Sequence, residues 1–127
     1  MTAPTKTRSS IWSGQTLTAG GGNTNSSWID LSGVFESQID IKITNGATGP
    51  TVAAQVQVQV ANDYNAGSPT LPANFGGALV ASITNNDINY FSITIPIGCA
   101  AVRLVAGSNT GQNVTIDADI SRVTAIS

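Results

Sequence analysis

Charged side chains are scarce in this chain of 127 residues, where Lys, Arg, Asp and Glu together make up 9%, against about 25% in an ordinary soluble domain. The formal net charge of −2 and the lack of a basic cluster argue against a nucleic-acid partner, whose phosphates would need neutralising. No apolar run approaches the roughly 18 residues of a membrane-spanning helix, so we also expect no membrane partner. A single cysteine excludes a disulfide framework within one chain.

Histidine is absent, and it is the side chain that most often performs general acid–base chemistry at neutral pH. Cys99 therefore has no histidine to activate it, and its place at the start of an apolar segment predicts a buried structural thiol. No Gly-x-Ser-x-Gly motif is present, and the glycines at 20–22 are not followed by a helix start and a lysine. We therefore predict that the protein is not an enzyme and has no catalytic residues, metal site or cofactor.

The length fits one domain, and a hydrophobic content of 41% is too high for a disordered chain. Residues 1–10 are polar, contain Lys6 and Arg8, and lack the apolar segment of a signal peptide. We therefore expect a polar N-terminal arm at 1–10, a single β-sandwich domain at 11–127, and a chain that is made and kept in the cytosol.

Apolar and polar residues alternate with a period of two along most of the domain, as expected of strands with one buried face. Between residues 55 and 60 three glutamines alternate with three valines, and residues 38–44 repeat the pattern with isoleucines. Stretches rich in Gly, Asn and Pro, which favour turns, separate these segments. The predicted strands cover residues 11–18, 27–31, 38–44, 52–61, 79–83, 91–95, 100–106 and 114–120.

About eight strands without a helical pattern predict an all-β sandwich of two antiparallel sheets. The long irregular segment at 62–77 fits a jelly roll, in which two Greek keys form the two sheets. An immunoglobulin-like sandwich is the alternative, because strand order is not visible in a sequence. The segment 11–18 alternates poorly around Gly14, which indicates a bulge.

Asp117 and Asp119 lie two residues apart on one predicted strand, so both project from the same face. Paired carboxylates can serve glycoside hydrolysis or bind calcium. No calcium-loop sequence surrounds them, however, and alternation by itself predicts acids on a solvated strand face. The solvated face is therefore the favoured interpretation.

Four large rings carry a polar group, namely Trp12, Trp28, Tyr64 and Tyr90. Rings of this kind stack on sugars in carbohydrate-binding sandwiches, but they more often pack into cores or interfaces. Packing is therefore favoured over sugar binding. Tyr64 lies in the long irregular segment and is the best single candidate for an exposed contact residue.

The outward positions of the predicted strands hold Gln, Thr and Ser where Lys and Glu would be expected. Uncharged polar groups cost less to desolvate than charged ones, and interface cores are depleted in charge. The composition thus fits a domain that meets copies of itself or a large partner. A solitary domain of low charge fits it nearly as well.

Two segments, Ile43–Asp63 and Ile95–Ala118, resemble small all-β proteins of tailed bacteriophages. In the first, a Gly/Asn-rich turn precedes a long alternating strand, and in the second an apolar strand with one Arg is followed by another such turn and a final strand. The group is similar to capsid decoration (cement) proteins with a jelly-roll-like sandwich. The resemblance implies a non-enzymatic virion protein on the capsid surface, binding the major capsid protein at a symmetry axis as a homo-oligomer, either dimer or trimer.

The resemblance supplies no site residues, so contact residues are proposed from the sequence alone. We expect the arm with Lys6 and Arg8, together with Trp12 and Tyr64, to contact the shell. Two alternatives stay open: another virion component such as a head fibre, tail or adaptor part, and a carbohydrate-binding adhesion module.

Overall fold

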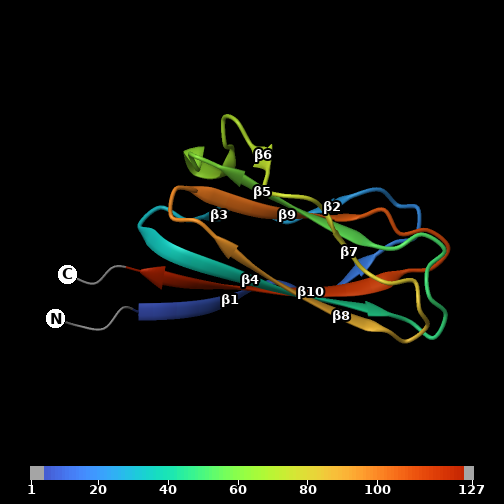
Figure 1. Cartoon of the computed structure of the whole chain (residues 1–127). Coiled ribbons are helices and arrows are strands. Elements are labelled where there is room, and N and C mark those ends of the chain that lie inside the picture. Colours follow the sequence, from blue (N-terminus) through green and yellow to red (C-terminus); the bar gives the residue numbers. More distant parts are fainter. Residues whose placement is uncertain (1–4, 125–127) are drawn as a thin grey trace.

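The alternating segments form long antiparallel strands, and these build two sheets that lie face to face around one core (Figure 1). The computed structural model describes residues 5–124. Within them the elements are β1 (Thr5–Leu17), β2 (Thr24–Asn25), β3 (Ile29–Asp30), β4 (Val34–Asn45), β5 (Gln55–Ala61), the 3₁₀ turn η1 (Asn65–Gly67), β6 (Ala73–Asn74), β7 (Leu79–Val80), β8 (Ile88–Ile95), β9 (Ala101–Gly107) and β10 (Val114–Thr124). In this part of the chain no helix is long and apolar enough to cross a membrane.

Sheet A has the strand order β1-β10-β4-β8, and sheet B has the order β2-β9-β5-β6, with β3 also on β9 and β7 also on β5. The short strands β2 and β3 both pair with β9, and β6 and β7 both pair with β5. Each couple of short strands therefore fills one position, which gives four positions in each sheet. This confirms the all-β, jelly-roll-like sandwich. The immunoglobulin-like alternative is wrong, because there the first strand pairs with the second, whereas here β1 pairs with the last strand.

The core consists of the inward residues that alternation predicts. Ile39, Ile41 and Ile43 on β4 are at most 2% exposed, and they face Val56 and Val58 of the other sheet within one apolar cluster. The inward residues of β10 are buried in the same cluster, namely Val114, Ile116, Ala118 and Ile120. Because side chains alternate between faces, burying this row fixes the outward direction of its neighbours.

Three predicted strands are shorter in the structure. The segment 52–54 precedes β5, and its one strand-like pairing is an isolated bridge from Val52 to Thr110. The segments 27–31 and 79–83 contribute only the two-residue strands β3 and β7, each an edge piece on a longer neighbour.

The polar arm expected at 1–10 is wrong for residues 5–10. These residues are the first half of β1 and pair with β10 from Thr5↔Thr124 to Ser10↔Asp119. A polar sequence suits this place because the first half of β1 lies at the sheet edge and is held by backbone pairing with β10 and by the Arg8–Asp119 ion pair. The apolar residues of β1 that pack on the core come later in the strand. Residues 1–4 lie outside the described residues.

The turn before β5 packs closely on the segment before β8. The side-chain amide of Asn45 donates to the backbone carbonyls of Ser82 and Thr84 at 3.0 and 2.9 Å. The backbone N–H of Gly49 donates to Oδ1 of Asn85 at 2.7 Å. A Cβ atom at Gly49 would lie 1.9 Å from the Ile83 carbonyl oxygen. Only glycine fits this approach.

We predict that Gly49→Ala lowers the free energy of unfolding by about 1–3 kcal/mol, because the two segments must separate to admit the methyl group. Gly77→Ala is the matched control, since a Cβ there meets no atom within 4 Å. Urea unfolding of both variants measures the difference. Equal losses in the two variants would contradict the close packing.

Candidate functional site

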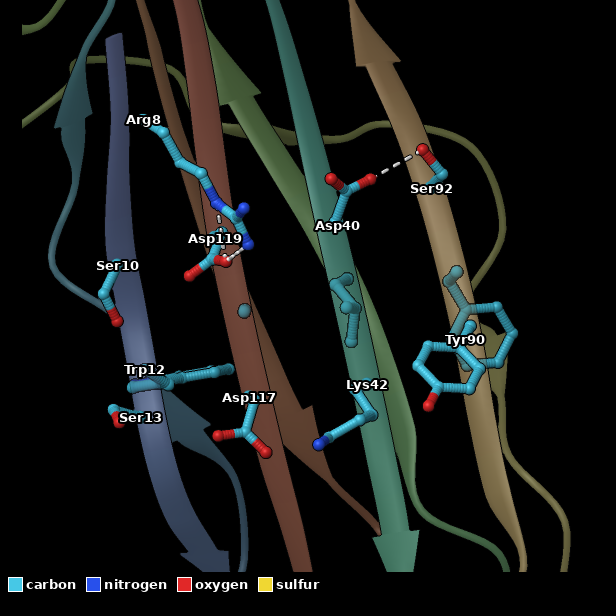
Figure 2. Close-up of a pocket in the computed structure, with 13 residues that line it drawn as sticks. Arg8, Ser10, Trp12, Ser13, Asp40, Lys42, Tyr90, Ser92, Asp117 and Asp119 are labelled. Carbon is cyan, nitrogen blue, oxygen red and sulfur yellow. Dashed lines mark hydrogen bonds and ion pairs between the residues drawn. The ribbon is translucent and has the colours of Figure 1, made fainter.

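The outer face of sheet A carries a groove of about 500 Å³, a volume within the range of ligand sites. It runs across all four strands of the sheet (Figure 2). The side chains labelled along it are Arg8, Ser10, Trp12, Ser13, Asp40, Lys42, Tyr90, Ser92, Asp117 and Asp119. Most occupy outward positions on their strands, because the alternate positions point inward and form the core.

Two carboxylates face each other in the groove, since Asp119 on β10 and Asp40 on β4 are register partners. Like charges directly opposite on neighbouring strands destabilise a sheet. Arg8 offsets this repulsion: its guanidinium forms an ion pair with Asp119, with Nε donating to Oδ2 at 3.0 Å. The residue expected to contact a shell is thus engaged within its own sheet.

Asp40 accepts hydrogen bonds from the neighbouring strand β8 and from its own strand β4. The Ser92 hydroxyl donates to Asp40 Oδ1 at 2.8 Å, and the Gln38 amide donates to the same oxygen at 3.1 Å. Hydrogen bonds from Gln38 and Ser92 hold the pKa of the Asp40 carboxyl below its ordinary value. Asp40 therefore stays ionised, whereas a general acid needs a raised pKa.

The bulge indicated around Gly14 is present and shapes one end of the groove. The β1–β10 register shifts between Ser10 and Trp12 and again between Trp12 and Gln15. Gly14 has a φ of +62°, and its amide donates to Asp117 Oδ1 at 2.8 Å. Asp117 and Asp119 are thus not simply solvated, because each holds β1 against β10.

Two aromatic rings lie at opposite sides of the groove. Trp12 is half-buried on β1, and in Figure 2 its ring reaches toward β10. Tyr90, on β8, is 73% exposed and is opposite Lys42 of β4. Tyr90 lies just before the predicted strand 91–95, so its outward place in the groove was not predicted, and it was not singled out as a contact residue.

The remaining sequence candidates lie elsewhere. Lys6 is exposed near the start of β1, and Tyr64 is half-buried immediately before η1, so neither lines the groove. Cys99 is half-buried against the core rather than fully buried, and burial raises the pKa of its thiol. Trp28 stacks under Arg103, whose Cζ lies 4.8 Å from the ring centroid.

A second surface lies at the end of the sandwich where Thr5 and Thr124 pair. Phe35, at the start of β4, is 52% exposed, and Ile97, just after β8, is 66% exposed. With Val34 and Cys99 they line a hollow of about 340 Å³. We call these four residues the end patch.

Neither surface has the donor set of a metal site: in residues 5–124 no group of three or more Cys, Asp or Glu side chains is placed to hold a metal ion. The groove combines three aspartates, two basic side chains and two rings, which suits binding by hydrogen bonds and stacking.

Comparison by sequence finds no match, either to a protein-family model or among curated proteins. The fold is similar to the SPBc2 prophage-derived protein YomS, with a TM-score of 0.52 and 16% identity over 98% of this chain and 97% of that protein. It is also similar to part of a chain in the structure of infectious bursal disease virus (Gx strain), with a TM-score of 0.58 and 9% identity over 95% of this chain and 32% of the viral one.

A Family 16 carbohydrate-binding module is similar as well, with a TM-score of 0.50 and 14% identity over 90% of this chain and 76% of that one. At such identities the likeness establishes the two-sheet fold alone.

We predict that Arg8→Ala destabilises the protein and that adding Asp119→Asn restores part of the loss, because the second change removes one of two facing negative charges. The loss should be larger at low ionic strength. Thermal unfolding at two salt concentrations measures both effects, with Lys6→Ala on the same strand as the control. A double variant no more stable than Arg8→Ala would contradict this account.

Proposed function

We propose that this protein is a non-enzymatic virion component that binds the exterior of a tailed-phage capsid and stabilises the shell. The end patch is the observation that carries the proposal. The resemblance of Ile43–Asp63 and Ile95–Ala118 to decoration proteins, and a fold that viral proteins also use, support it.

The end patch suits attachment to a large protein surface. Phe35 and Ile97 present large apolar side chains to solvent beside a hollow, and burying such groups is the main favourable term in association. Lys6 lies at the same end, because it pairs with Val123 next to Thr124. Its charge adds steering toward an acidic capsid surface.

Tyr64 belongs to the same end of the molecule. The Ala100 amide donates to the Ala61 carbonyl at 2.8 Å, which places the end of β5 beside the start of β9, and η1 follows within a few residues. Figure 1 shows this turn on the side where the chain ends emerge. We therefore keep Lys6 and Tyr64 as shell contacts and assign Arg8 and Trp12 to the groove.

No chemistry is needed for this role. A protein that binds only the assembled shell stabilises it by mass action, in proportion to its affinity and concentration. The major capsid protein is the partner that this mechanism requires, and the capsid surface of the virion is the location it implies.

We predict that the protein co-sediments with undecorated shells of the major capsid protein and that Phe35→Ser/Ile97→Ser raises the Kd about tenfold or more, because apolar anchors are lost. Val80→Ser/Ile83→Ser is the matched control, since Val80 and Ile83 are 53% and 55% exposed at the opposite end of the sandwich. Circular dichroism verifies that both variants fold.

Purified tails form a parallel arm of the same experiment. Binding to tails but not to shells would favour the second virion role, that of a tail or adaptor part, and would overturn shell decoration. Equal loss of shell binding in both double variants would overturn the assignment of the end patch.

Self-association through β8 is a further part of the proposal. Residues 88–95 contain no charge and no proline, and among the described strands β8 pairs only with β4. Natural sheets protect open edges with lysine, proline or bulges. The other edge, β1, has such protection in Lys6, Arg8 and two register shifts. We therefore propose that a second copy pairs along β8 to form a two-fold dimer.

Thr94→Lys, an exposed change on β8, should shift the protein toward monomer by placing a charge at the shared edge. Thr16→Lys on β1 is the control and should leave association unchanged. Sedimentation velocity distinguishes the species. A wild-type monomer at all concentrations, or a Thr94→Lys variant that dimerises as wild type, would contradict pairing through β8.

A further inference from the structure

The charges in the groove on sheet A nearly balance. Its ionic side chains are Arg8, Lys42, Asp40, Asp117 and Asp119, with a formal net charge of −1. An anionic ligand would meet three carboxylates, and a cationic ligand would meet a lysine and an arginine. A neutral ligand with many hydroxyl groups suits both, because each hydroxyl can donate to a carboxylate and accept from a cation.

Hydrogen-bonding capacity remains open along the groove floor. Asp117 and Asp40 each use Oδ1 for internal bonds, and in residues 5–124 their Oδ2 atoms accept no hydrogen bond from the protein. Lys42 is the register partner of Asp117 and forms no ion pair in that part of the chain, and Figure 2 shows it extending from β4 toward Asp117. Two acceptors are therefore held in place by their own hydrogen bonds, and a donor is available beside them.

The two rings supply stacking surfaces on either side of this polar floor: Tyr90 is 73% exposed, and Trp12, which also packs against the core, is partly exposed. Tyr90 is on β8 and Trp12 on β1, so three strand spacings, about 14 Å, separate their backbones. Trp12 is held by the bulge that Asp117 stabilises, and Tyr90 projects from a regular strand. A ligand that touches both rings must be longer than a single small ring, and it must offer apolar faces as well as hydroxyls.

We propose that this groove binds a short neutral oligosaccharide. The C–H faces of its sugar rings would stack on Tyr90 and Trp12, and its hydroxyls would bond to Lys42, Asp40 and Asp117. The Asp40 and Asp117 carboxylates and the Trp12 ring are held before binding, which lowers the ordering cost on association. The inference rests on the groove and not on shell attachment, because the end patch lies on a different part of the molecule.

The test is a microarray of neutral oligosaccharides built from glucose, galactose, mannose, rhamnose and N-acetylglucosamine. Sialylated and phosphorylated glycans on the same array are the charged comparison set. The strongest neutral ligand is then titrated by isothermal titration calorimetry. We expect binding to at least one neutral series, with affinity reduced about tenfold by Tyr90→Ala through lost stacking. Lys42→Ala should reduce affinity as well, because it removes a charged hydrogen-bond donor.

Tyr64→Ala is the matched control, because it removes an equal ring outside the groove and should leave glycan binding unchanged. Tyr90 is largely exposed, so its loss leaves the fold intact, and thermal unfolding verifies this. No neutral glycan bound at millimolar concentration would overturn the proposal. Binding restricted to charged glycans, or unchanged by both Tyr90→Ala and Lys42→Ala, would overturn it equally.

Discussion

The pairing of β10 with both β1 and β4 is the constraint on which the rest of the molecule depends. On its inner face, Ile116, Ala118 and Ile120 join the buried isoleucines of β4. On its outer face, Asp117 and Asp119 hold β1 through the Gly14 amide and the Arg8 guanidinium. Because side chains alternate strictly, a slip of one residue would expose the core row and bury the acids. The fold and the groove are therefore fixed by one register.

This register also ties the acids of β10 into the sheet. One is ion-paired with arginine, the other bonds to a bulged backbone, and neighbouring donors lower the pKa of Asp40 opposite. The three carboxylates thus accept hydrogen bonds within the sheet, and the lowered pKa of Asp40 is the opposite of the raised pKa that a general acid needs. The proposed roles, attachment at one end and recognition on one face, need binding surfaces alone. The low charge of the chain fits attachment through the end patch, whose four residues carry no charge.

Alternation made much of the fold predictable. The inward isoleucines of β4 and the alternation of β8 from Phe91 to Ile95 follow from a period of two, and the number of strands with one long connection favoured a jelly roll. Residues 5–10 were misread as an arm because an edge strand held by its backbone leaves no apolar signal. The groove was not predictable: Asp40, Ser92 and Asp117 meet only because β4 lies between β10 and β8, and strand order is absent from the sequence.

A cryo-electron microscopy map of the native particle at side-chain resolution tests the central claim, that attachment and recognition use separate surfaces. The account predicts density for this sandwich on the shell, with Phe35 and Ile97 against the major capsid protein and the groove between Trp12 and Tyr90 open to solvent. A map with the groove buried against the shell, or with this chain on the tail alone, would contradict it.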